Sequence, residues 1–213
     1  MFWKEWIADI KEATCNMSKK QTCSYIATYY WPHILGTVLS TALIFFIGRY
    51  YLFGNQKPVF TCVMVNQQID LERDQKMEEM FSKESGLDKK RVVIDSDYNF
   101  SYKDFQLEGV NESSYEKFFF QWRNGELDAV IMSESFYRYC QELGGDFCSI
   151  EKSKIGSFEP YMDNGICTAI VLGNDRFTEK VFGKKDEKLL LTFPKTGKHE
   201  AESKQFLKFY CSL

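Results

Sequence analysis

The chain has 213 residues, a length that allows one domain with an appendage or two small domains. Hydrophobic residues make up 44% and charged residues 27% of the sequence, which excludes a disordered chain, a collagen and a transporter with many membrane spans. The formal net charge is −3 and no basic face stands out, so we expect no nucleic acid among the partners.

The charge is divided unevenly along the chain. Residues 1–57 contain six Lys or Arg against three Asp or Glu, which gives +3. The remaining 21 basic and 27 acidic residues give residues 58–213 a charge of −6. This break indicates two parts of different character.

Residues 1–31 begin with the stretch FWKEWIADIKEA, in which apolar and charged side chains recur with helical spacing. The apolar face of the predicted helix consists of Phe2, Trp3, Trp6, Ile7 and Ile10. Such a helix either lies in the interface of a membrane or packs against another membrane protein, and both alternatives are open. We assign residues 1–31 to an amphipathic segment that is cytoplasmic or interfacial.

An uncharged run extends from Ile34 to Gly48, and we predict a transmembrane helix at residues 32–53. About 20 residues at 1.5 Å each span roughly 30 Å of hydrocarbon. Aromatic rings favour the headgroup level, and an arginine can extend its charge outward from the last turn. The predicted membrane anchors are Trp31, Arg49, Tyr50 and Tyr51.

A cleavable signal peptide is the alternative to a span, but the leader before the apolar run is long and bulky residues follow it. Lys19 and Lys20 on one side are balanced by Lys57 and Arg73 on the other, so the positive-inside rule gives a tie. The positive leader favours an inside N-terminus. We therefore expect a single-pass protein of the cell membrane with its C-terminal domain outside.

Residues 54–58 are predicted to link the span to an extracytoplasmic α/β domain at residues 59–213. Short apolar runs alternate there with amphipathic helices, a pattern typical of βαβ units. We expect strands at 59–66, 91–95, 127–133, 166–172 and 188–193, and helices at 69–84, 114–125, 134–145 and 199–211. The predicted fold is a three-layer domain with a mostly parallel sheet of about five strands. Polar segments at 97–113, 151–165 and 174–187 are predicted to be surface loops.

The run FFFQWRNGELDAVIMSESFYRYCQELGGDFCSI resembles a helix–strand–helix stretch of type 2 extracytoplasmic (periplasmic) solute-binding proteins. The ending, KLLLTF followed by a helix with a Phe-Leu pair, is similar to their last strand and helix. Residues 58–213 are also similar to small membrane-anchored proteins of Gram-positive bacteria built on one such lobe. The resemblance implies an outside lobe of the periplasmic-binding-protein type. Because that family binds ligand between two lobes, a single lobe would dimerise or dock onto a membrane partner to complete a site.

Ligands of open parallel sheets bind beyond the carboxyl ends of the strands. The residues at these positions, which we predict to bind a ligand, are Asn66, Gln67, Gln68, Ser96, Asp97, Tyr98, Ser133 and Glu134. The alternative is that they are turn and capping residues, with Ser133 as an N-cap and Glu134 favoured by the helix dipole.

The sequence contains few candidate catalytic residues and none of the catalytic motifs considered. Its histidines are His33 and His199, and the motifs G-x-S-x-G, H-E-x-x-H and G-x-G-x-x-G do not occur. We predict no catalytic residue, no metal site and no cofactor. The seven cysteines lack zinc-site spacing and are expected to be buried, and Cys140 and Cys148 are the pair expected to bridge in an oxidising compartment.

We therefore expect a non-catalytic, membrane-tethered, solute-binding-like module that acts as an accessory or recognition component of a membrane complex such as an ABC-type importer. Its expected partners are the lipid bilayer and other membrane proteins, either a transporter permease or further copies of the chain, and a small-molecule ligand is left open. The alternative is a structural or assembly subunit of the membrane with no small-molecule ligand.

Overall fold

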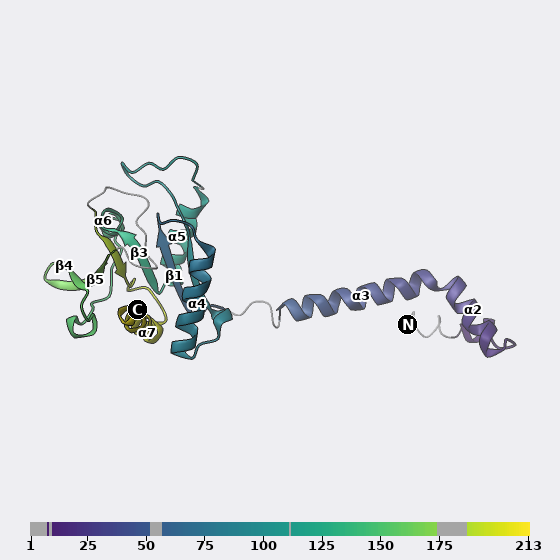
Figure 1. Ribbon diagram of the computed structural model, residues 1–213. Coiled ribbons are helices and arrows are strands. Elements are labelled where there is room, and N and C mark those ends of the chain that lie inside the picture. Colours follow the sequence, from purple (N-terminus) through teal and green to yellow (C-terminus); the bar gives the residue numbers. More distant parts are fainter. Residues whose placement is uncertain (1–7, 9, 52–56, 111, 174–186) are drawn as a thin grey trace. The chain divides into compact units, whose positions relative to one another are not determined.

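Figure 1 shows a computed structural model of the chain, which describes residue 8 and residues 10–51, 57–110, 112–173 and 187–213. The chain divides into two compact units, Met1–Gln56 and Lys57–Leu213. Most of the apolar face predicted at the N-terminus and most of the predicted 54–58 linker lie outside the described residues.

The described part of the first unit contains the helices α2 (Lys19–Tyr29) and α3 (Trp31–Arg49). α2 follows Ser18, whose backbone N–H donates to Gln21 Oε1 at 3.0 Å. Pro32 lies in the first turn of α3, where its missing N–H would find no helical partner. α3 thus begins one residue before the predicted span, and π-helical geometry continues through Tyr50 and Tyr51.

α3 carries the apolar run of the sequence. Among the described residues it is the one helix that is long and apolar enough to cross a membrane, with 19 residues, a mean hydropathy of 1.5 and no buried side chain in the apolar window. A transmembrane span and a signal sequence both meet these criteria near an N-terminus.

The second unit contains a six-stranded mixed sheet with the strand order β2-β1-β3-β6-β5-β4. The strands are β1 (Phe60–Val65), β2 (Val92–Tyr98), β3 (Ala129–Ser133), β4 (Glu159–Asp163), β5 (Ile166–Leu172) and β6 (Leu189–Thr192). β1 pairs in parallel with β2 and β3, whereas the other neighbouring pairs are antiparallel. The prediction of a mostly parallel sheet of about five strands is therefore right only for the part built on β1, β2 and β3.

β4 is the strand that the sequence analysis assigned to a loop at 151–165. Its sequence, EPYMD, contains a proline and two acidic residues and lacks β-branched side chains. It forms a strand because a two-residue turn folds it back onto β5, which it pairs in antiparallel fashion. The turn residues Asn164 and Gly165 have φ of 49° and 83°, the left-handed values that such tight hairpins require.

Helices cover both faces of the sheet, so the unit has three layers, as the alternating pattern predicted (Figure 1). The helices are α4 (Leu71–Ser85), α5 (Ser113–Asn124), α6 (Glu134–Glu142) and α7 (Glu200–Ser212), with short 3-10 turns at Lys89–Arg91 and Lys152–Lys154. α4 and α7 pack on one face through residues that include Phe81 and Phe206. α5 and α6 pack on the other face through residues that include Phe118 and Phe136.

β1 contributes to both cores. All of its residues are buried, and successive side chains point to opposite faces. Phe60 and Met64 join the core under α4 and α7, whereas Val63 joins the core under α5 and α6. Under α4 and α7, the rings of Phe60, Phe81 and Phe206 lie with their centroids 4.7 to 5.1 Å apart.

Both edge strands have features that oppose further strand pairing. In β2, the N–H groups of Ile94 and Ser96 donate to the carboxylates of Glu78 and Asp74 on α4, at 3.1 and 2.9 Å. At the other edge, Pro160 removes a backbone donor from β4, and the β4–β5 ladder is irregular.

Phe81→Ala should lower the free energy of unfolding by about 3–5 kcal/mol, because it removes a fully buried ring and leaves a cavity among the remaining aromatic side chains. Urea unfolding of the full chain in an uncharged detergent, followed by near-UV circular dichroism, measures the loss. Phe120→Ala is the matched control: this ring is 66% exposed, so the expected change is within about 0.5 kcal/mol. Equal losses for the two variants would contradict this assignment of the core.

Candidate functional site

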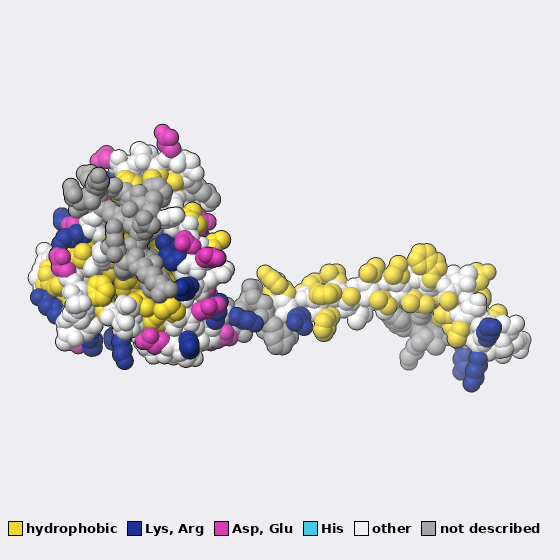
Figure 2. All heavy atoms as spheres, viewed as in Figure 1, with side chains coloured by type: hydrophobic (Ala, Val, Ile, Leu, Met, Phe, Trp, Pro, Cys, Tyr) yellow, Lys and Arg dark blue, Asp and Glu magenta, His cyan; other side chains and the backbone are white. Residues whose placement is uncertain are grey.

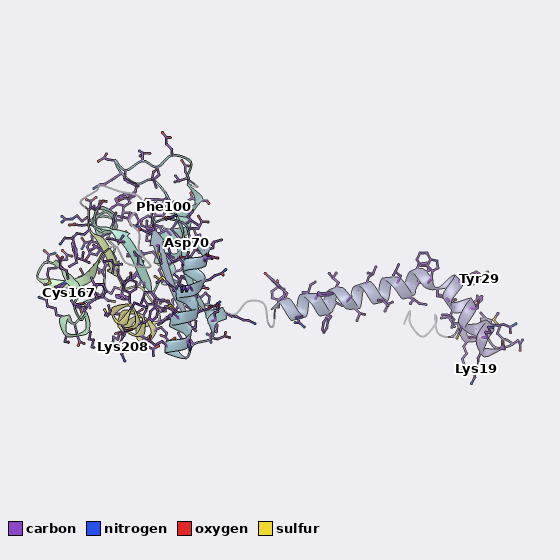
Figure 3. The ribbon with its side chains drawn as sticks, in the orientation of Figure 1. Lys19, Tyr29, Asp70, Phe100, Cys167 and Lys208 are labelled. Carbon is purple, nitrogen blue, oxygen red and sulfur yellow. The ribbon has the colours of Figure 1, made fainter. Side chains whose placement is uncertain are left out.

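The parallel strands β1, β2 and β3 end at one edge of the sheet, here called the carboxyl edge. The predicted ligand residues lie at this edge, because each of them ends or follows one of these strands. Residues 99–110 cover part of it, and the side chains of Phe100 and Tyr102 are buried there. Figure 3 shows Phe100 and Asp70 toward this end of the sheet and Cys167 toward the other end.

Asn66 fastens this covering segment to the end of β1. Its Nδ2 donates to the carbonyl oxygen of Phe100 at 3.1 Å, and its Oδ1 accepts from the N–H of Phe100 at 2.9 Å. The backbone of Asn66 has a φ of 53°, a left-handed conformation that asparagine tolerates better than most residues. Asn66 is buried, so its polar atoms serve the fold rather than an incoming ligand.

The two glutamines after β1 differ in their surroundings. Gln67 is buried, and its Nε2 donates to the carbonyl oxygens of Val65 and Asn66 at 3.2 and 3.0 Å. Its Oε1 is buried without a hydrogen-bond partner, alone in this respect among the predicted ligand residues. Gln68 is exposed, and its carbonyl oxygen accepts from Arg73 Nη2 at 2.9 Å.

Ser96 contacts α4 rather than open solvent. Its hydroxyl donates to Asp74 Oδ2 at 2.5 Å and accepts from the N–H of Asp70 at 3.1 Å. The other carboxylate oxygen of Asp74 forms an ion pair with Arg73 at 3.1 Å. These buried contacts connect β2 to the first turn of α4.

Asp97 and Tyr98 point in different directions. Asp97 is exposed, and its N–H donates to Asp95 Oδ1 at 2.9 Å. The Tyr98 hydroxyl donates to Gln121 Oε1 at 2.5 Å, and Lys117 Nζ lies 4.3 Å from the centre of the Tyr98 ring. Burial raises the pKa of Tyr98, so its hydroxyl stays protonated at neutral pH.

Ser133 and Glu134 begin α6. Ser133 Oγ accepts from the N–H of Phe136 at 3.3 Å, as an N-cap residue does. Glu134 Oε1 accepts from Arg138 at 2.7 Å and from the Tyr161 hydroxyl at 3.1 Å. The hydrogen bond from Arg138 is the main cause that lowers the pKa of Glu134. The carboxyl edge thus gathers the predicted residues, but most of their polar atoms are bound by groups of the same unit.

A cavity of about 630 Å³ opens toward the opposite end of the sheet. α6 and α7, which cover different faces, both contribute to its wall, together with the β4–β5 turn and the residues after α6 and β6. This volume lies within the range of small-molecule sites. Its walls include Tyr137, Gln141, Phe147, Cys148, Asp163 and Leu207.

One end of the cavity is polar. The hydroxyl groups of Tyr137 and Thr168 lie 2.7 Å apart, and Gln141 Nε2 donates to Asp163 Oδ2 at 2.5 Å. Asn164 Nδ2 donates to the other oxygen of Asp163 at 3.2 Å. Burial raises the pKa of Tyr137 to about 12, so this hydroxyl is neutral at physiological pH.

The outer wall of the cavity carries charges of both signs. Its ion pairs are Lys154 with Glu151 at 2.8 Å, Lys195 with Asp146 at 3.9 Å and Lys204 with Glu200 at 2.5 Å. On the face shown in Figure 2, basic and acidic side chains of the second unit are likewise interspersed rather than gathered by sign. The cavity therefore lacks the concentrated positive charge of a phosphate or nucleic-acid site.

The seven cysteines are free thiols, which corrects the predicted bridge between Cys140 and Cys148. Cys140 is buried in the core under α5 and α6, whereas Cys148 packs against the core under α4 and α7. The two side chains therefore belong to opposite faces of the sheet. Cys148 is half-buried in the cavity wall, and burial raises the pKa of its thiol.

A further polar cluster lies at the start of α7. The buried carboxylate of Asp128 accepts from the N–H groups of Thr61 and His199, at 2.9 and 3.1 Å, and lies 3.0 Å from His199 Nδ1. Burial raises the pKa of Asp128. Ser203 Oγ donates to the carbonyl oxygens of Asp128 and His199 at 3.1 and 3.0 Å. The cluster therefore fixes the start of α7, and its serine is not directed at the imidazole as a nucleophile would be.

Neither a search for metal-binding groups nor comparison with known proteins indicates a further site in the described residues. In the described parts of the chain, no group of three or more His, Cys, Asp or Glu side chains is arranged to hold a metal ion. No family model, curated protein or solved structure matches the chain. The resemblance to solute-binding proteins therefore stays a prediction.

The sequence analysis did not predict the cavity. Tyr137, Gln141 and Leu207 lie on predicted helices, but other wall residues, such as Phe147 and Asp163, come from segments without a clear period. Asp163 and the residues after α6 lie in or beside stretches that were assigned to loops. One available signal was the Asn164-Gly165 pair between two short apolar runs, which predicts a tight hairpin. That hairpin pairs Asp163 with Ile166 and brings both to the cavity wall.

Asn66→Ala should lower the free energy of unfolding by about 2–4 kcal/mol, because it removes both hydrogen bonds to Phe100. It also places alanine in a left-handed backbone conformation, which is strained for that residue. Asn66→Gly should lose less, since glycine accepts that backbone conformation. Urea unfolding measures both losses. Gln68→Ala is the exposed control, with an expected change within about 0.5 kcal/mol. A ligand-binding role for Asn66 would instead leave stability unchanged.

Arg138→Met should raise the pKa of Glu134 toward its ordinary value, because it removes the main stabilising partner of the carboxylate. In the native chain, the lowered pKa contributes stability above the unfolded-state value of about 4.3, and this contribution is lost as pH falls through the folded-state pKa. The pair is partly exposed, so the loss at neutral pH should not exceed about 1 kcal/mol. NMR titration of the Glu134 carboxyl carbon measures the shift, and Arg138→Lys is the charge-retaining control. A carboxyl pKa that does not move in the methionine variant would contradict the pairing.

Proposed function

We propose that the chain is a membrane-anchored recognition module of the solute-binding type, with α3 as the transmembrane span and the α/β unit outside the cytoplasm. The unit binds a ligand in the cavity bordered by α6 and α7 and carries out no covalent chemistry. It acts as an accessory component of a membrane complex such as an ABC-type importer.

The cavity of about 630 Å³ is the observation that carries this proposal. It combines apolar rings with a few convergent hydrogen-bonding groups, the usual composition of a small-molecule site. At the carboxyl edge, by contrast, Asn66, Ser96 and Ser133 are engaged within the unit. We therefore favour the cavity over the carboxyl edge as the ligand site.

Membrane anchoring is supported by the exposed apolar surface of α3. Leu39, Ile44 and Phe45 are 60%, 70% and 64% exposed, which is unfavourable in water and favourable in hydrocarbon. Trp31 precedes the apolar run, and Arg49 closes it with Tyr50 and Tyr51, a set typical of the two headgroup levels.

An accessory role follows from the single lobe. The walls of the cavity come from one α/β unit, so a bound ligand keeps part of its surface in solvent until another protein covers it. A partner in the membrane would supply that cover and would explain why the unit is tethered.

Binding rather than catalysis is supported by the state of the nucleophilic side chains. Ser203 directs its hydroxyl at carbonyl oxygens. Burial raises the pKa of Cys62, Cys140 and Cys148, so these thiols are protonated and weakly nucleophilic at neutral pH.

The proposed topology is tested with one epitope at the N-terminus and another after Leu213, in a chain that is otherwise unchanged. Protease added to intact cells should remove the C-terminal epitope and spare the N-terminal one, because only the α/β unit is outside. Both epitopes should be lost after permeabilisation. A protected C-terminal epitope would contradict the outside location, and a soluble product without the N-terminal epitope would identify α3 as a signal sequence.

Crosslinking in native membranes separates the accessory role from the alternative of an assembly subunit without a ligand. A transporter permease among the products supports the accessory role. Products that contain only copies of this chain would favour the assembly subunit.

A further inference from the structure

The charges around the cavity are not balanced within the unit. The lysines of its wall each have a carboxylate partner within 4 Å. Asp163 lines the polar end and accepts from Gln141 and Asn164, but it has no ion pair among the described residues. Its donors are the amides of Gln141 and Asn164 and the Tyr137 hydroxyl, and none of these neutral groups brings a positive charge to the carboxylate.

We propose that the cavity binds a small organic cation, a protonated amine or guanidinium joined to an apolar group, with the charged group on Asp163. This inference rests on the proposed binding function and specifies the ligand of the same cavity. An anionic ligand is disfavoured, because it would meet Asp163 and would find each cavity lysine already paired.

The carboxylate of Asp163 is oriented for such a contact. Gln141 binds Oδ2 and Asn164 binds Oδ1, and the Tyr137 hydroxyl is a third neutral donor beside the carboxylate. Each carboxylate oxygen accepts about two hydrogen bonds, so three neutral donors leave at least one position for a cationic donor. A charge-assisted hydrogen bond at that position is roughly twice as strong as one from a neutral donor.

The remaining wall accounts for the apolar part of the ligand. It contains Phe147, Ile150, Phe193 and Leu207. The Phe147 ring stacks on Tyr137 with the ring centroids 4.2 Å apart, so it is held in place before a ligand arrives. A cationic group bonded to an aromatic or aliphatic group can therefore contact Asp163 while its apolar part contacts these side chains.

Three probes with similar aromatic bodies separate the charge from the apolar contact: 2-phenylethylamine is a cation, 3-phenylpropionate is an anion and 2-phenylethanol is neutral. The full chain in an uncharged detergent is titrated with each, and NMR chemical-shift changes give the dissociation constants. We expect the amine to bind most tightly. Asp163→Asn should weaken amine binding roughly 10- to 100-fold, because it replaces a charge-assisted bond by a neutral one.

Asp146→Asn is the matched control, since Asp146 is also a carboxylate of the cavity wall but is paired with Lys195. It should change the dissociation constant of the amine by no more than about twofold. The melting temperatures of both variants are measured first, so that a folding defect is recognised. If Asp163→Asn is unstable, Asp163→Glu in the native fold should retain a preference for the amine over the alcohol.

Three results would overturn the inference. Equal binding of amine and alcohol, or amine binding that Asp163→Asn leaves unchanged, would overturn the cation assignment but keep the cavity as a ligand site. If no probe binds and none slows alkylation of Cys148 by N-ethylmaleimide, the cation site is wrong, whereas the topology test reports on membrane anchoring independently.

Discussion

Burial of β1 on both of its faces is the constraint on which the α/β unit depends. A strand whose residues are all apolar or buried needs helices above and below the sheet, and the chain meets this need by returning α4 and α7 to one face and α5 and α6 to the other. Phe60 and Val63, three residues apart, thereby serve two separate cores. The remaining strands extend the sheet on either side of this centre.

The two ends of that sheet have different characters. At the carboxyl edge, the segment after β2 is drawn over the strand ends by Asn66 and by the hydroxyl of Tyr102, which lies 3.1 Å from Ser133 Oγ. At the other end, Gln141 of α6 donates to Asp163 beside the β4–β5 turn, and the cavity that α6, α7 and this turn border stays open. Residues 99–110 cover part of the carboxyl edge, so the open site lies at the other end of the sheet.

The sequence predicted the elements that carry a regular period. Alternation and apolar runs indicated β1 and β3, and the helices around Phe81, Phe118 and Phe206 follow from their spacing. The direction of β6 was not predictable, because a short apolar run such as LLLT can form a buried strand in either a parallel or an antiparallel sheet. The ends of β1 and β3 were located to within one residue, but β2 continues through Tyr98, three residues beyond its predicted end. The engagement of Asn66 was not foreseen, since its partner lies 34 residues away in a segment without periodicity.

The blocked edges of the sheet have a consequence for copies of the chain that meet at high local concentration. Exposed strand edges are the common route by which sheets from neighbouring molecules join into fibrils. Here the carboxylates of Glu78 and Asp74 already occupy outward N–H groups of β2, and Pro160 interrupts the donors of β4. Copies that collide therefore have few free strand donors through which to join into an extended cross-β aggregate.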